Sequence, residues 1–84
     1  MVFVGIDVAK DKHDLFAVDS DGVVLCDNFT FANSAAGFAS LLERVSAWGK
    51  IKVGIEATGH YSSNLLSFLK AHDFEVVVFN PLSV

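Results

Sequence analysis

Two short stretches decide the fold of this chain: Val4-Gly5-Ile6-Asp7 and Val53-Gly54-Ile55-Glu56. Each is made of β-favouring apolar residues, carries a glycine and ends in a carboxylate. Because side chains alternate along a strand, the glycine and the acid two positions later lie on the same face. If the two strands are parallel neighbours in register, Asp7 and Glu56 stand side by side, about 4.8 Å apart, at the carboxyl end of the sheet.

The residues around these stretches predict five strands and two helices. The strands are expected over residues 2–7, 13–19, 23–31, 51–56 and 74–79. One helix is expected over residues 34–48, before the fourth strand, and the other starts at Thr58 or Gly59, before the fifth. Ser20-Asp21-Gly22 supplies the turn of a hairpin between the second and third strands. Helical crossovers join parallel strands, so the last two strands are expected to run parallel to the first. This mixed β-β-β-α-β-α-β order opens the ribonuclease H-like fold and, equally, the actin and sugar-kinase fold.

The composition limits what the chain can do. With 84 residues, 52% hydrophobic and 19% charged, it forms one compact domain. Six Lys and Arg against ten Asp and Glu give a net charge of −4, which argues against a broad phosphate-binding surface. A nucleic-acid role then depends on metal-held contacts at one point, or on basic surface supplied from elsewhere.

The location and redox setting follow from simpler features. No apolar stretch approaches the roughly 20 residues of a membrane span, and residues 1–5 lack the basic region of a secretion signal. The expected location is therefore the cytoplasm. The single cysteine, Cys26, lies among apolar residues and is expected to be a buried structural thiol.

Two carboxylates placed side by side need a cation between them. Asp7 and Glu56 repel each other, and one takes up a proton unless a positive charge intervenes. Mg²⁺ (or Mn²⁺) prefers hard oxygen ligands and is commonly held by one or two carboxylates together with substrate phosphates. Gly5 and Gly54 leave open space beside the acids for a phosphodiester. Either acid alone more often caps a helix or lies in solvent, but the matched pair favours a catalytic metal site.

Several other polar residues are candidates for contact with nucleic acid. Lys10, Lys12 and His13 form a small basic patch, although the interleaved acids favour a solvated turn. Thr58 is most simply a helix cap, and His60 is most simply a surface residue at the start of a helix. Lys10, Lys12, Thr58 and His60 remain candidate phosphate contacts. Trp48 and the eight Phe residues fall largely at core spacing and are expected to pack rather than to stack on bases.

Four motifs stand out along the chain: Gly5-Ile6-Asp7-Val8-Ala9-Lys10-Asp11-Lys12-His13-Asp14, Phe31-Ala32-Asn33 leading to Gly37-Phe38, Glu56-Ala57-Thr58-Gly59-His60-Tyr61, and Val78-Phe79-Asn80-Pro81. Together they resemble the amino-terminal part of the insertion-sequence 110 family of transposases. The resemblance covers essentially the whole chain. The motif at residues 56–61 is quite specific, whereas Gly5-Ile6-Asp7-Val8 alone is weak.

The resemblance implies a RuvC-like ribonuclease H fold with an Asp-Glu-Asp-Asp set of carboxylates that binds divalent metal. Asp7 matches the first acid and Glu56 the second. The family's other two acids, and a separate domain with a serine nucleophile, lie beyond Val84. Residues 1–84 are then an incomplete, amino-terminal portion of the catalytic domain of a DNA transposase. The family is also associated with a guide RNA that bridges donor and target DNA.

Three expectations and two alternatives complete this interpretation. The isolated 84-residue piece should be inactive, should bind Mg²⁺ weakly, and should self-associate through apolar surface that a complete fold would cover. One alternative is a phosphotransferase of the actin and sugar-kinase fold, which Val8-Ala9-Lys10-Asp11-Lys12 disfavours because it lacks phosphate-binding glycines. The other is a noncatalytic interaction module with two incidental surface acids.

Overall fold

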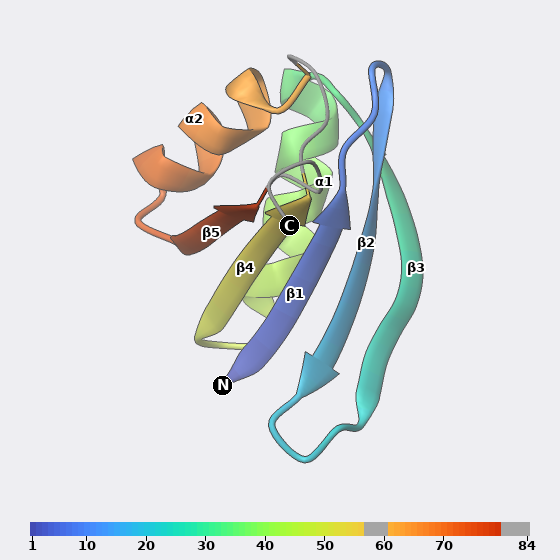
Figure 1. Cartoon of the computed structure of the whole chain (residues 1–84), viewed down its shortest axis with the longest axis vertical. Helices are drawn as coiled ribbons and strands as arrows, with labels where there is room; N and C mark the ends of the chain where they lie inside the picture. Colours follow the sequence, from blue (N-terminus) through green and yellow to red (C-terminus); the bar gives the residue numbers. More distant parts are fainter. Residues whose placement is uncertain (57–60, 80–84) are drawn as a thin grey trace.

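The computed structural model describes residues 1–56 and 61–79, which form a five-stranded mixed sheet and two helices. The elements are β1 (Val2–Asp7), β2 (Lys12–Asp19), β3 (Val24–Ala32), α1 (Ala35–Ser46), β4 (Ile51–Glu56), α2 (Ser63–Ala71) and β5 (Glu75–Phe79). The strand order across the sheet is β3-β2-β1-β4-β5, so β1 lies at the centre (Figure 1).

The strand directions agree with the sequence. β1, β4 and β5 run parallel, while β2 pairs antiparallel with both β1 and β3. The hairpin turn is closed by Asp19, whose Oδ1 accepts hydrogen bonds from the backbone N–H groups of Asp21 and Val23. Gly22 follows with a φ of +84°, which glycine adopts without steric cost.

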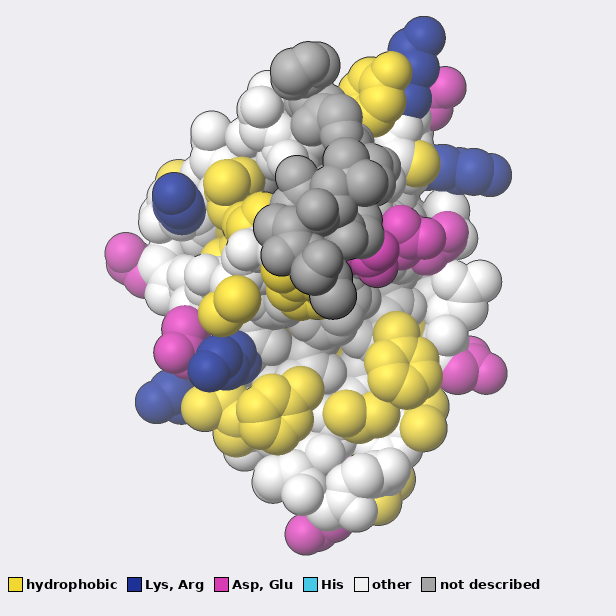
Figure 2. Space-filling view, viewed as in Figure 1, with side chains coloured by type: hydrophobic (Ala, Val, Ile, Leu, Met, Phe, Trp, Pro, Cys, Tyr) yellow, Lys and Arg dark blue, Asp and Glu magenta, His cyan; other side chains and the backbone are white. Residues whose placement is uncertain are grey.

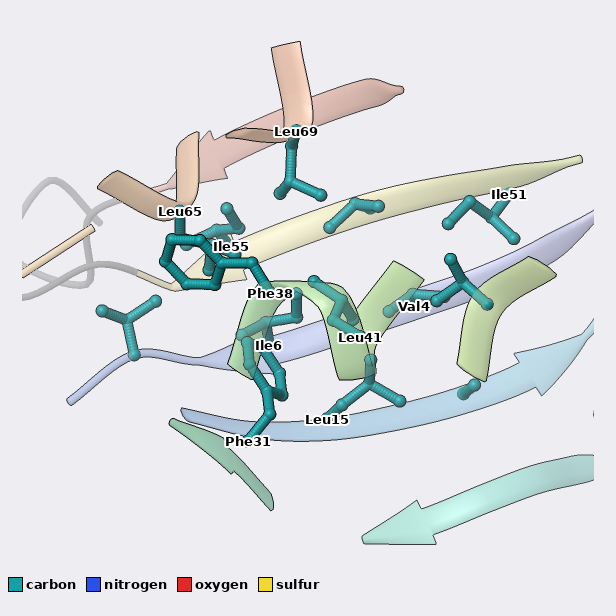
Figure 3. Close-up of a cluster of buried hydrophobic side chains, with 14 of the residues drawn as sticks. Val4, Ile6, Leu15, Phe31, Phe38, Leu41, Ile51, Ile55, Leu65 and Leu69 are labelled. Carbon is teal, nitrogen blue, oxygen red and sulfur yellow. The ribbon is translucent and has the colours of Figure 1, made fainter. Parts of the chain in front are cut away.

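Both helices pack on the same face of the sheet, and α1 lies behind β1 and β4 in Figure 1. Alternate residues of the strands point toward the helices and form one core. Figure 3 shows its centre, where side chains of α1 and α2 meet those of the strands: Phe38, Leu41, Leu65 and Leu69 from the helices, and Val4, Ile6, Leu15, Phe31, Ile51 and Ile55 from the sheet. No helix of the described residues is long and apolar enough to cross a membrane.

The α1 helix is fixed at both ends by residues that its sequence supplies. Ser34 is the N-cap, and its Oγ accepts a hydrogen bond from the backbone N–H of Gly37 at 3.2 Å. Gly37 itself lies so close to the end of β3 that a Cβ there would overlap the carbonyl group of Ala32. Beyond the helix, Gly49 takes a φ of +71°, as its position after the helix predicts.

The predicted boundaries differ from the observed ones mainly at the helices. The first helix ends at Ser46 rather than at residue 48, and the N–H of Trp48 bonds to the carbonyl of Val45 in the following turn. The second helix begins at Ser63, because residues 61 and 62 form a turn, and so it starts later than predicted. Thr58 and Gly59 lie outside the described residues, as do Asn80 and Pro81.

The opposite face of the sheet carries no helix within the described part of the chain. Three of the Phe residues expected to pack are instead on this outer face, with exposed fractions of 44% for Phe3, 45% for Phe16 and 53% for Phe79. Figure 2, which views this face, shows hydrophobic side chains gathered on its lower half and acidic side chains above them. Cys26 is half-buried rather than fully buried, because it lies on β3 at the edge of the sheet.

Candidate carboxylate site

Asp7 and Glu56 are register partners at the ends of neighbouring parallel strands. The pairing of β1 with β4 runs without interruption from Val2 opposite Ile51 to Asp7 opposite Glu56, as the matched tetrapeptides predict. Both acids are exposed, and both occupy outer-face positions in strands that alternate between buried and more exposed residues. The two carboxylates therefore leave the sheet on the same face, one strand spacing of about 4.8 Å apart at the backbone.

A third carboxylate, which the sequence interpretation did not assign to the site, lies on the other side of Asp7. Asp14 of β2 is the register partner of Asp7, so the order across three strands is Asp14, Asp7, Glu56. Thr30 of β3 donates a hydrogen bond from its Oγ1 to Asp14 Oδ1 at 2.5 Å, which orients this carboxylate. Within residues 1–56 and 61–79, no three His, Cys, Asp or Glu side chains converge closely enough to hold a metal ion by themselves.

The outer face has a shallow hollow of about 470 Å³, which begins two residues before these acids and is not lined by either of them. Its floor includes Gly5 and Gly54, which face each other in register on β1 and β4. A Cβ on Gly5 would meet only Phe16 O at 4.0 Å, and one on Gly54 would meet Phe79 Cε1 at 3.5 Å. Both distances are ordinary van der Waals contacts, so packing among the described residues does not require either glycine. A glycine inside a strand often marks the close approach of a ligand or another backbone.

No cationic side chain neutralises the two acids in the described part of the chain. The one ion pair there joins Lys52 Nζ to Glu75 Oε1 at 3.9 Å, further back along the strands. Among residues 1–56 and 61–79, Asp7 and Glu56 thus have no ion-pair partner, and both are exposed on the outer face. This donor set suits Mg²⁺, which accepts one or two carboxylates and completes its coordination with water and phosphate oxygens.

The predicted nucleic-acid contacts are only partly described. Lys10 and Lys12 are exposed in and beside the connection between β1 and β2, which leads away from Asp7. Asn33 holds this connection, because its Nδ2 donates to the carbonyl of Lys10 at 3.0 Å. Thr58 and His60 lie outside the described residues, so their predicted contacts stay predictions.

The placement of His13 in a basic patch is wrong. His13 has an exposed fraction of 0%, and it faces the core rather than the solvent. The reason is the alternation of β2, in which His13, Leu15 and Ala17 point toward the helices and the intervening residues point away. This period of two was visible in the sequence, but the charged neighbours of His13 obscured it.

Comparison with known proteins identifies the family. The model of the DEDD transposases of the insertion-sequence 110 type, described as a transposase, matches residues 4–84. An uncharacterised 44.8 kDa protein of insertion element IS116 from Streptomyces clavuligerus is 33% identical over 76 residues, which are 90% of this chain and 19% of that protein. The pilin gene-inverting protein of Moraxella lacunata is 30% identical over 86 residues, covering 98% of this chain and 26% of the relative.

Solved structures agree with the fold. A Thermus thermophilus RuvC structure, in complex with a Holliday junction substrate, superposes with a TM-score of 0.71 at 15% identity over 98% of this chain and 66% of that chain. The fowlpox virus Holliday junction resolvase superposes with a TM-score of 0.62 at 17% identity, over 96% of this chain and 62% of that chain. The chain thus spans about a fifth to a quarter of the curated relatives and about two thirds of the resolvases. It has the RuvC-like ribonuclease H fold, and it belongs to the insertion-sequence 110 family of DEDD transposases.

Proposed function

We propose that residues 1–84 are the amino-terminal portion of the catalytic domain of a DNA transposase, and that Asp7 and Glu56 form part of its divalent-metal site. The register pairing of these two acids at the end of the parallel strands carries the proposal. Family membership supports it, because the family is named for its set of four acids. The whole protein would catalyse metal-dependent cleavage and transfer of DNA strands.

The side chains of the described residues have separate tasks in this site. Asp7 and Glu56 would hold Mg²⁺ or Mn²⁺ through their carboxylate oxygens, and Thr30 would keep Asp14 oriented beside them. The bound ion would neutralise charge on the scissile phosphate and lower the pKa of an attacking hydroxyl. Gly5 and Gly54 would let the phosphodiester approach the acids without a side chain in the way.

Two acids of a set of four are not sufficient for catalysis. The remaining acids, and the serine nucleophile that the family resemblance implies, would come from elsewhere in a longer protein. We therefore expect the 84-residue chain to bind Mg²⁺ with a dissociation constant no tighter than about 1 mM, which corresponds to about −4 kcal/mol. It should neither cleave DNA nor transfer strands.

DNA is the proposed substrate of the whole protein. The RuvC structure contains a Holliday junction, and the pilin gene-inverting proteins are named for the inversion of a gene. Lys10 and Lys12 are exposed close to the end of β1 and would contact backbone phosphates, with Thr58 and His60 as further proposed contacts. The family resemblance also makes a guide RNA a proposed partner. The cytoplasm is the proposed location, on the sequence features given above and not on the resemblance.

The outer face of the sheet supports a proposal of self-association. Phe3, Phe16, Val77 and Phe79 are all between 44% and 53% exposed there. Exposed apolar surface of this kind is commonly covered in an assembly. We propose that the isolated chain forms a homo-oligomer in which a second copy covers this face.

The metal proposal is tested by calorimetric titration of the 84-residue chain with Mn²⁺ and Mg²⁺. The variants Asp7→Asn and Glu56→Gln keep the shape of each side chain but remove its charge. Asp21→Asn is the matched control, because Asp21 is an exposed acid in the hairpin turn at the far end of β2. Weak binding that is lost in both site variants and retained in the control is expected. Equal binding by all four chains would contradict the site and favour a noncatalytic module.

The predicted inactivity is tested separately with purified chain and supercoiled DNA in Mg²⁺ or Mn²⁺. No nicking above the level of Asp7→Ala is expected. Robust metal-dependent nicking that Asp7→Ala abolishes would show that the described acids suffice, and the proposal of an incomplete site would be wrong.

A further inference from the structure

His13 is the one fully buried polar side chain among the described residues. Its ring is held between two aromatic side chains on the helix-covered face of the sheet. The centroid of Phe31 from β3 lies 5.4 Å away in an edge-on arrangement, and that of Phe38 from α1 lies 6.5 Å away with the rings nearly parallel, at 9°. These aromatic contacts do not by themselves require a polar ring.

The polar atoms of His13 make one hydrogen bond, and it is local. The backbone N–H of Ala9 donates to His13 Nδ1 at 3.2 Å. Since Nδ1 accepts, the proton of the neutral imidazole is assigned to Nε2, which has no hydrogen-bond partner within the described residues. A buried N–H without a partner is unfavourable. What the imidazole supplies, and an apolar side chain does not, is therefore the acceptor at Nδ1.

This acceptor holds the segment of chain that follows Asp7. The connection between β1 and β2 covers residues 8–11, and Val8, at its start, is buried in the core. Asn33 fixes the far half of the connection through the carbonyl groups of Lys10 and Asp11, at 3.0 Å and 2.9 Å. The bond from Ala9 to His13 fixes the near half, two residues from Asp7.

We propose that His13 is a positioning residue for the carboxylate site. Phe31 and Phe38 fix its ring, its Nδ1 fixes the amide of Ala9, and that amide sets the path of the backbone as it leaves Asp7. His13 lies on the helix-covered face and Asp7 on the outer face, so His13 holds the side chain of Asp7 beside Glu56 through the backbone that joins them. This inference rests on the proposed metal site and adds a residue to it that does not touch the metal.

Two substitutions separate positioning from packing. His13→Phe preserves the aromatic contacts and removes the acceptor, whereas His13→Asn loses the ring and keeps an oxygen close to the place of Nδ1. In the metal-free chain, hydrogen exchange followed by NMR should show the amide of Ala9 exchanging about tenfold faster in His13→Phe than in the wild type. The amide of Asp7 should shift in the same variant, and His13→Asn should restore both signals toward the wild type.

The affinity for Mn²⁺ should follow the same order. His13→Phe is expected to bind about tenfold more weakly than the wild type, and His13→Asn to lie between them, although it is the less well packed and less stable variant. A purely structural role predicts the reverse order, with His13→Phe closest to the wild type, and that result would overturn the proposal. Unchanged protection of Ala9 in His13→Phe would overturn it as well. Failure of the wild type to bind Mn²⁺ would instead overturn the proposed metal site that His13 serves.

Discussion

At the scale of single residues, the glycines of this chain differ in whether packing requires them. Gly37 is required by the fold, because the carbonyl group of Ala32 occupies the space that a Cβ would need. Gly5 and Gly54 are not required by any described contact, yet they face each other in register beside the two acids. The sequence indicates that the latter two leave space near a site, whereas the close approach at Gly37 depends on how α1 meets β3 and is visible only in the structure.

Gly37→Ala should destabilise the chain. The added methyl group forces α1 away from the end of β3, and such overpacking typically costs about 1–3 kcal/mol. Denaturant unfolding followed by circular dichroism measures the change. Ala36→Gly is a control on the exposed side of the same helical turn, and it should cost only about 1 kcal/mol through helix propensity. Equal stability of Gly37→Ala and the wild type would contradict the described contact.

Gly5→Ala should leave the fold intact and impair the site. A methyl group fits at this position, and alanine reduces the entropy of the unfolded chain, so the free energy of unfolding should be unchanged or higher by up to about 1 kcal/mol. In a full-length protein, the same change should reduce DNA cleavage, because the added methyl group occupies part of the hollow that Gly5 lines. A variant that is both stable and fully active would show that no substrate approaches Gly5.

The histidine illustrates what sequence interpretation misses at this scale. Asp7 and Glu56 are recognisable because their tetrapeptides match, but His13 and Asp14 have no such counterpart. Their roles depend on the register with which β2 pairs with β1 after the connection at residues 8–11. Local charge suggested an exposed patch there, and the alternation of β2 determines burial instead.

At the scale of elements, caps and strand alternation set most boundaries. β1 and β4 have the predicted limits, because each is a mostly apolar run of β-favouring residues that ends in an acid. β3 is less regular: Asp27 and Asn28 together oppose Phe16, which forms a bulge in the edge strand. Nothing in the sequence of β3 marks that extra residue, so the bulge could not be predicted from the sequence.

Ser34→Ala should weaken the start of α1. The Oγ of Ser34 accepts the N–H of Gly37, and loss of a serine N-cap costs about 1 kcal/mol. Ser40→Ala is the matched control, because Ser40 lies within the same helix and its Oγ donates to the carbonyl of Ala36. That control should be neutral or slightly stabilising. Thermal unfolding compares the two, and an equal loss of stability would mean that the cap is not decisive.

At the scale of the whole molecule, one face of the sheet is covered by helices, and the outer face carries no helix within residues 1–56 and 61–79. Sequence periodicity predicts which residues share a face of the sheet, but it does not show which of the two faces the helices cover. Phe3, Phe16 and Phe79 were therefore expected in the core and instead lie on the outer face. The acids stand at the end of this same face, so whatever covers it also borders the site.

Phe16→Thr should reduce self-association of the isolated chain. Phe16 is 45% exposed at the wall of the hollow, and threonine retains the preference for a strand while removing most of the apolar surface. Light scattering over a range of concentrations measures the oligomeric state. Leu25→Thr, at an apolar residue on the edge strand β3 that is 40% exposed, is the control and should not change it. A wild-type chain that is monomeric throughout would contradict self-association.

The most direct test of the central claim is a titration of the isotopically labelled chain with Mn²⁺, observed by two-dimensional NMR. A paramagnetic ion broadens the signals of the nuclei close to it. If Asp7 and Glu56 share one ion, the amides at the ends of β1 and β4 should broaden first and together, and Asp7→Asn should abolish both effects. Broadening that begins at Asp21 or Asp27, or that affects Asp7 without Glu56, would contradict a shared site.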